Sequence, residues 1–419
     1  DSGWMPMPTI TYEENGVIYR QRTYVAPYDD SPLPEGWPAW ANRQPLCVAE
    51  YSIENQTKQN AAVALRLDGW QKAEAASIVE TQHGVEKMSI QEDDGFVRFL
   101  KNGQPLIAFR VDEAKGLSAT SQEGSVKIEG ELGAGEIARC TSVIPGWQID
   151  SGRWGDLKTG DELYEKTRQY WIDLMTPAMK VELPDKFIQN AIIANQVHCW
   201  LAARSDSEYR IAPWIASFIY GPLESESQSV IRGMEFFGQN DFARRSFDYF
   251  FSKYNPEGYL TTGYTLMGTG WNLWTIGEYI DLTHNEAWLK ENLIQIAWAA
   301  QWIAAQREKT KRMGPDGKKL PEWGLMPPGA MADWEVFSYY FYLNGYYYAG
   351  SQAPVFPLRD GSWVPEYPTH AYCPMPIEQM YMGEDFGRSW CYDVELGSHH
   401  LIPMGVLDPL GDQARQIME

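Results

Sequence analysis

The hydrophobic pattern of this chain changes its period near residue 155, and this change limits the possible folds more than any other feature. Before it, apolar and polar residues alternate in short runs, which is typical of strands with one buried face. Five such runs are 9–12, 17–20, 62–67, 96–100 and 125–128. After it, apolar residues recur every three to four positions, as on one face of a helix. The sequence therefore predicts a strand-rich domain over residues 1–155 and a helical domain over residues 156–419.

Turn sequences separate the alternating runs of the first domain. Three of them are Glu14-Asn15-Gly16, Asp93-Asp94-Gly95 and Lys101-Asn102-Gly103. Asn, Asp and Gly tolerate the left-handed backbone that tight hairpins need. Closely spaced antiparallel strands with one polar and one apolar face favour a β-sandwich.

The second domain contains a series of helical segments joined by short connections. The predicted helices are 161–175, 185–203, 224–238, 240–254, 270–283, 286–307 and 335–349. Helix pairs recur about every 40 residues, which indicates an array of helical hairpins. Three long inserts, at 205–223, 308–334 and 351–400, are rich in aromatic and acidic residues. Inserts of that length in a compact domain usually carry function.

Composition narrows the choice of partners. The formal net charge is −21, and an acidic surface disfavours nucleic acid and anionic lipid. No apolar run is long enough to span a bilayer. The five cysteines are widely spaced, so we expect neither a metal site nor a cofactor that depends on them. The 18 Trp and 24 Tyr serve largely as core, but so many rings with a polar handle also favour a cleft that stacks against sugars.

Three segments of the helical domain resemble the six-hairpin, (α/α)6-barrel glycosidases. They are residues 212–224, residues 270–289 and residues 324–334. The resemblance implies an antiparallel β-sandwich followed by an (α/α)6 toroid of helical hairpins. In the trehalase and processing α-glucosidase branches, a loop rich in Gly, Leu and Pro ends in an aspartate that acts as general acid. The resemblance assigns this role to Asp333.

The chain departs from the pattern of these glycosidases at two points. The Trp-Asp pair of the first segment is Trp214-Ile215 here, so the acid that binds substrate at this point is missing or moved. Six hairpins also need more chain than residues 160–419 easily supply, so we expect an incomplete toroid. We therefore expect the general base beyond Glu419 or on another polypeptide segment that completes the barrel, and we interpret the chain as a piece of a longer protein.

Glycoside cleavage needs one protonated and one ionised carboxyl group, and three acidic residues are catalytic candidates. Asp333 is the candidate acid; it is equally a favoured N-cap for the helix predicted at 335–349, or a ligand of substrate hydroxyls. Glu335 either shares a cleft with Asp333 or stabilises the first turn of the same helix. Glu224 follows an aromatic segment and is a second catalytic candidate or a partner of its own helix dipole.

The remaining candidates are side chains that bind sugars by stacking or by hydrogen bonds. They are Trp214, Tyr220, Trp271, Trp334, Glu384, Asp385, Arg388 and His399. Packing in the core is the alternative role of Trp271, and a surface ion pair is the alternative for Asp385 with Arg388.

The function that these observations favour is that of a secreted or periplasmic glycoside hydrolase. It would cleave an oligo- or polysaccharide with inversion, using a carboxylic general acid. A polysaccharide lyase on a similar toroid, with Tyr and His as base and acid, is one alternative. A non-catalytic glycan-binding protein and a glycoside phosphorylase are the others. Product absorbance in the near ultraviolet distinguishes the lyase, and a requirement for phosphate distinguishes the phosphorylase.

Overall fold

The structure, a computed structural model, describes most of the chain up to residue 352. The described residues are 3–28, 44–72, 85–93, 95–122, 124–147, 149, 154, 157, 160–206, 209–215, 221–262, 267–331, 334–339, 341–352 and 410. They form a mixed architecture with a large antiparallel sheet and, within these ranges, seven helices. The chain divides into two compact units. Unit 1 is Asp1–Pro177 with Val181–Val197, and unit 2 is Ala178–Lys180 with His198–Glu419. The boundary near residue 155 stays a prediction.

The described residues of unit 1 form two antiparallel sheets and a short ribbon. In spatial order, the seven-stranded sheet is β1 (Thr9–Glu14), β2 (Val17–Pro27), β3 (Pro45–Asn55), β12 (Ile137–Pro145), β9 (Gln104–Glu113), β8 (Phe96–Lys101) and β7 (Ser89–Asp93). The three-stranded sheet is β10 (Ser118–Gln122), β11 (Ser125–Leu132) and β4 (Ala61–Asp68), and the ribbon is β5 (Trp70–Lys72) with β6 (Val85–Lys87).

Two Asn-Gly turns set the register of the larger sheet. Asn15 has φ 51° and Gly16 has φ 77°, and the same values recur at Asn102 and Gly103. Successive positive φ values define the tight hairpin turn whose twist matches that of the strands. The two turns join β1 to β2 and β8 to β9, as the turn sequences predict.

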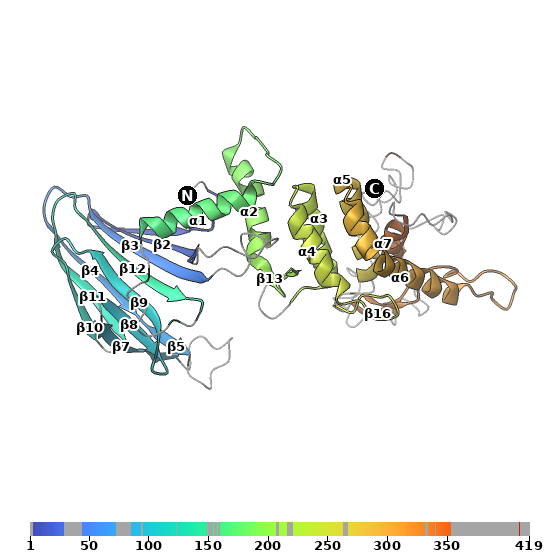
Figure 1. Ribbon diagram of the computed structural model, residues 1–419, viewed down its shortest axis with the longest axis horizontal. Coiled ribbons are helices and arrows are strands. Elements are labelled where there is room, and N and C mark those ends of the chain that lie inside the picture. The colour runs from blue at the N-terminus through green and yellow to red at the C-terminus, as the bar shows by residue number, and fades with distance from the viewer. Residues whose placement is uncertain are drawn as a thin grey trace, which may run out of the picture. The chain divides into compact units, whose positions relative to one another are not determined.

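The seven-stranded sheet buries apolar side chains on both faces. On one face, Val17, Ile53 and Phe109 share a core with Val126 and residues of the three-stranded sheet. The opposite face has a second core, which the helix α1 (Asp161–Met175) covers against β2 (Figure 1). The two sheets thus pack as layers over a common core, and all five predicted strand segments lie in strands.

Six of the seven helices in the described ranges begin and end within three residues of the predicted positions. After α1, they are α2 (Lys186–Ala202), α3 (Glu224–Phe236), α4 (Asn240–Phe251), α5 (Gly268–Thr283), α6 (Glu286–Thr310) and α7 (Phe341–Gln352). None of the helices in the described ranges is both long and apolar enough to cross a membrane. The helix predicted over 335–349 is wrong for its first part, because residues Trp334–Ser338 form the strand β16.

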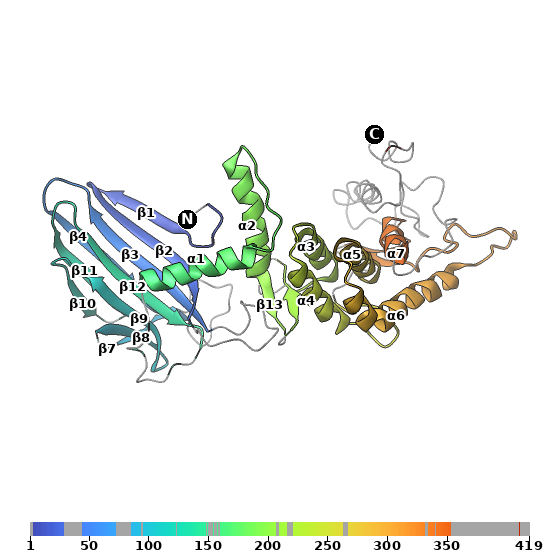
Figure 2. The same cartoon turned by 45° about the horizontal axis from the view of Figure 1, so that its top comes forward.

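Within unit 2, α3, α5 and α7 lie side by side in one row, and α4 and α6 lie in another (Figure 2). Two side-chain contacts show that α3 and α5 are parallel, because the later residue of α3 meets the later residue of α5. Gln228 bonds to Asn272, and Arg232 bonds to Glu278. Parallel α5 and α7 approach closely at glycines, since a Cβ on Gly350 would lie 2.4 Å from the Gly270 carbonyl oxygen. Alternate helices of a hairpin array pack in this way. A closed toroid stays a proposal.

Candidate functional site

The N-terminal ends of α3 and α5 meet at Glu224. This carboxylate side chain begins α3 and is buried, with 1% of its surface exposed. A Cβ on Gly268, the first residue of α5, would lie 2.2 Å from the Glu224 Cγ. The side chain therefore lies directly over the first turn of α5. The positive ends of two helix dipoles stabilise a negative charge at this place.

A buried polar network continues from this point between α3 and α5. The Tyr254 hydroxyl donates to the Asn272 Oδ1 at 2.8 Å, and the Asn272 Nδ2 donates to the Gln228 Oε1 at 3.2 Å. Burial, and secondarily the Glu224 charge, raise the pKa of the Tyr347 phenol. Burial also raises the pKa of Tyr254. Both phenols therefore keep their protons at neutral pH, and the Tyr254 hydroxyl donates its hydrogen to Asn272.

Three hydrogen bonds, two of them fully buried, hold the segment that leads to the candidate acid. The Arg307 Nε donates to the Gly324 carbonyl at 2.8 Å, and the Thr310 hydroxyl donates to the Leu325 carbonyl at 2.6 Å. The Met326 amide donates to the Asn344 Oδ1 at 2.7 Å. Residues of α6 and α7 thus fix the backbone of 324–326 from two sides. Leu325 and Met326 are themselves 5% exposed.

A two-stranded ribbon follows this anchored segment. The strand β15 (Gly329–Met331) pairs antiparallel with β16 (Trp334–Ser338), with Gly329 opposite Ser338 and Met331 opposite Trp334. Asp333 lies outside the described residues. Glu335 lies in β16, so it is not in the first turn of a helix, and the prediction that Asp333 caps a helix beginning there is wrong. Backbone pairing with β15 replaces the helix that the aromatic run predicts.

Two predicted stacking residues are described, and both pack against other side chains. Trp214 lies partly buried against the core of unit 2, with the Arg204 guanidinium 5.6 Å from its ring centre. Trp271 stacks on Tyr346 with ring centres 4.3 Å apart and an interplanar angle of 20°. One face of Trp271 is therefore already covered. Its role in substrate binding stays a prediction, as does that of Trp214.

Other predicted site residues lie where their side chains are not described. The backbone of Trp334 belongs to β16. The rest lie outside the described residues: Tyr220, Glu384, Asp385, Arg388 and His399. Within the described ranges, no three His, Cys, Asp or Glu side chains gather in a group that could hold a metal ion.

Sequence reasoning missed one buried acid in this unit. Glu235, near the end of α3, is 3% exposed, and neither carboxyl oxygen has a hydrogen-bond partner among the described residues. Burial, and then the charge of Glu278, raise its pKa well above the usual range, against the opposing effect of Arg232. Its position on the buried face of an amphipathic helix, one residue after Met234, is the only signal that the sequence contains.

No protein-family model matches this chain, and no curated protein matches it significantly in sequence. One similar solved structure is a putative kojibiose phosphorylase from the human microbiome, with 9% identity and a TM-score of 0.41 over 74% of this chain. Another is a polysaccharide lyase, with 11% identity and a TM-score of 0.19 over 98% of this chain. The chain spans 45% and 62% of these two proteins. Both TM-scores lie below 0.5, so neither likeness establishes a shared fold.

Proposed function

We propose that this chain is a glycoside hydrolase in which Asp333 is the general acid. The observation that supports this most is the strand Trp334–Ser338. A helix beginning at 335 would give Asp333 a sufficient structural role as its cap. The nearest following helix begins only at Phe341, so this structural role does not apply. Two roles remain, hydrogen bonding to substrate hydroxyls and proton donation to the leaving oxygen, and we propose the second because the resemblance assigns it.

The anchoring of the neighbouring backbone also supports a catalytic role. A general acid has to be held within hydrogen-bond reach of the leaving oxygen. The bonds to Gly324, Leu325 and Met326 fix the chain before Asp333. The pairing of Met331 with Trp334 fixes the backbone on both sides of it.

The expected chemistry is acid-assisted cleavage of a glycosidic bond. Asp333 delivers a proton to the leaving oxygen, and an ionised carboxylate activates a water molecule on the opposite face of the sugar. This geometry inverts the anomeric centre. A substrate in an apolar cleft would raise the pKa of Asp333, because burial penalises the charged form. The base belongs to an unassigned part of the array or to another polypeptide segment that completes the toroid.

Other residues have supporting roles in this proposal. Glu335 and Glu224 are the further catalytic candidates, and Glu224 lies at the helix ends beside the buried Tyr347. Trp214, Trp271 and Trp334 provide aromatic surface for an oligo- or polysaccharide. Such a polymer is met outside the cytoplasm, so we propose that the protein is secreted or periplasmic.

The experiment compares Asp333→Asn with the parent chain on a panel of neutral and acidic glycans. We expect a loss of about 10²- to 10⁴-fold in cleavage rate, the range typical of a general acid. Asp316→Asn is the matched control, because Asp316 lies on the same insert and its side chain is 61% exposed. Reducing sugar is measured with and without inorganic phosphate, and the first anomer formed is identified by NMR.

Each outcome separates hydrolysis from another reaction. Cleavage that is undiminished in Asp333→Asn removes Asp333 as the acid. Cleavage that requires phosphate identifies a phosphorylase, and a product that absorbs in the near ultraviolet identifies a lyase. Binding of a glycan without any turnover identifies a non-catalytic glycan-binding protein.

A further inference from the structure

Unit 1 contains a hollow of about 570 Å³ on the outer face of its seven-stranded sheet. Its volume lies within the range of small-molecule sites, about 300–1,000 Å³. The register of the strands determines which side chains line this hollow. One row across the sheet is Thr9, Arg22, Glu50, Thr141 and Arg110, each opposite the next on neighbouring strands. A second row places Arg20, Ser52, Arg139 and Glu113 in the same way.

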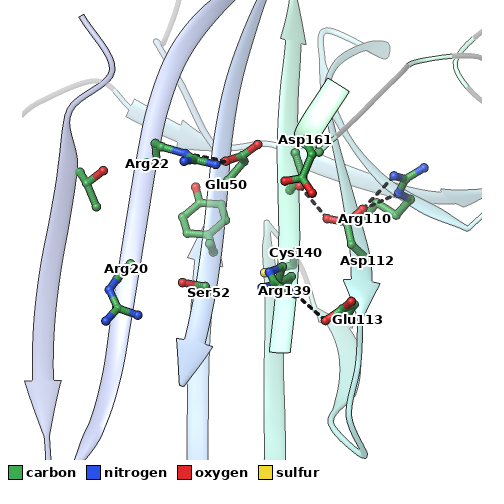
Figure 3. Close-up of a pocket in the computed structure, with 14 residues that line it drawn as sticks. Arg20, Arg22, Glu50, Ser52, Arg110, Asp112, Glu113, Arg139, Cys140 and Asp161 are labelled. Atoms are coloured by element: carbon green, nitrogen blue, oxygen red, sulfur yellow. Dashed lines mark hydrogen bonds and ion pairs between the residues drawn. The ribbon is translucent and has the colours of Figure 1, made fainter. Parts of the chain in front are cut away.

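The same sheet face is apolar immediately beyond these rows. The next row along the strands is Tyr24, Val48, Val143 and Ala108, and α1 covers it through Leu163. The helix begins at Asp161, at the edge of the hollow (Figure 3). Helix and sheet together therefore form a concave boundary, and the polar rows form its floor.

A β-bulge adds one more acid to the floor. The pairing of β12 with β9 shifts between Arg139 and Cys140, which leaves Asp112 as the extra residue. Bulges of this kind redirect a side chain. The Asp112 carboxylate accepts from the Thr141 hydroxyl at 2.6 Å and from the Arg110 Nε at 2.9 Å.

Ion pairs hold the charged groups of the floor in fixed orientations (Figure 3). The Arg22 Nε donates to Glu50 at 2.8 Å, and the Tyr24 hydroxyl donates to the other oxygen of the same carboxylate at 2.6 Å. The Arg22 guanidinium also lies 3.8 Å from the ring centre of Tyr164. Arg139 pairs with Glu113 at 2.8 Å. Donors and acceptors that are held in place before binding lose less entropy when a ligand arrives.

The charges around the hollow cancel. The charged residues that line it are four arginines and four acids: Arg20, Arg22, Arg110, Arg139, Glu50, Asp112, Glu113 and Asp161. A phosphate or a uronate would meet as many carboxylates as guanidinium groups. A neutral hydroxyl, by contrast, both donates and accepts, so it benefits from guanidinium and carboxylate groups side by side.

We propose that this hollow is a binding site for a neutral saccharide. The unused N–H groups of Arg22 and Arg110 donate to ring and hydroxyl oxygens. The Asp161 carboxylate, which makes no ion pair with a described residue, accepts from hydroxyl groups. The site lies wholly within unit 1, so it holds a glycan independently of any reaction at Asp333.

The test is calorimetric titration of the whole chain carrying Asp333→Asn, so that a probe survives even if Asp333 is the acid. The neutral probes are maltopentaose, cellopentaose, xylopentaose and mannopentaose, and the acidic probe is trigalacturonate. We expect at least one neutral probe to bind, and to bind about tenfold or more weakly after Arg110→Gln and after Asp161→Asn. Each substitution removes a hydrogen bond to a charged group.

Two matched variants control for general effects. Arg66→Gln breaks an Arg–Asp pair that, like Arg110 with Asp112, is two residues apart with the Nε 2.9 Å from the carboxylate, but it lies outside the hollow. Asp173→Asn removes an acid of α1 outside the hollow. Both are expected to keep the parent affinity.

Three results overturn the proposal. The first is that no neutral probe binds. The second is that every neutral probe keeps its affinity in both hollow variants, which places binding elsewhere. The third is a preference for trigalacturonate over all neutral probes. None of these results bears on the role of Asp333, and undiminished cleavage by Asp333→Asn does not bear on the hollow.

Discussion

Glu224 and Gly268 are 44 positions apart in the sequence, but the Glu224 side chain occupies the space that a Cβ on Gly268 would need. Such a Cβ would lie only 2.2 Å from the Glu224 Cγ. Only glycine lets the first turn of α5 approach α3 so closely. The contact places a carboxylate at the joint N-terminal end of two parallel helices. Glycine at position 268 is therefore a packing requirement.

Gly268→Ala should destabilise the protein. Glu224 is 1% exposed, so it can move away only by disturbing its neighbours, and overpacking of this kind costs about 1–3 kcal/mol. The free energy of unfolding in urea measures the loss. Gly233→Ala is the control, because a Cβ at position 233 of α3 has no atom within 4 Å. That variant should gain up to about 1 kcal/mol from helix propensity. Equal stabilisation by both substitutions would contradict the packing of Glu224 over α5.

Glu235→Gln should change how stability depends on pH. Burial raises the pKa of Glu235 in the folded protein above its usual value of 4.5. At a pH between the usual pKa and the raised pKa, the folded state holds one proton more than the unfolded state. The free energy of unfolding therefore falls as pH rises, by on the order of 1 kcal/mol per pH unit for one proton. Glutamine has no carboxyl group that titrates, so the free energy of unfolding of the variant should depend less on pH above about 4.5. At neutral pH the variant should be more stable than the parent chain.

Urea unfolding at several pH values from 4 to 8 measures this difference. Glu257→Gln, on an exposed loop, is the matched control and should follow the parent chain. If Glu235→Gln retains the slope of the parent chain, the buried carboxyl is not the group that releases the proton.

The hydrophobic period was sufficient to predict the helices α1 to α6 and five of the strands within the described residues. Alternation over residues such as 17–20 and 125–128 reports which face of a strand is buried, and the Asn-Gly turns report where hairpins close. The seven-stranded order and the polar rows of unit 1 are different. They depend on which strands become neighbours, and no local pattern encodes that choice.

The segment after Asp333 shows why the period failed there. Residues 334–338 include apolar and aromatic side chains that suit a helix or a strand, and both periods fit so short a run. Residues 334–338 form a strand because the backbone of Gly329–Met331 pairs with them. The buried network of Gln228, Asn272 and Tyr254 was missed for a similar reason, because contacts between parallel helices join residues far apart in sequence.

Thr310→Val tests whether the anchored segment positions the candidate acid. The Thr310 hydroxyl donates to the Leu325 carbonyl at 2.6 Å, and both residues are buried. Valine keeps the shape and removes the donor, and leaving a buried carbonyl unsatisfied costs about 1–3 kcal/mol. Thermal unfolding should therefore begin at a lower temperature. The same bond fixes the backbone before Asp333. We therefore expect kcat, measured below the unfolding transition, to fall as well, and KM to change less.

Thr275→Val is the matched control for this effect. Thr275 is fully buried in α5, and its hydroxyl donates to the Trp271 carbonyl at 3.0 Å. That carbonyl is four residues earlier in the same helix and already accepts the backbone bond, so its loss leaves no unsatisfied group. Thr275→Val should keep kcat and most of the stability. If Thr310→Val lowers stability but keeps the parent kcat, the anchor is structural only, and the position of Asp333 does not depend on it.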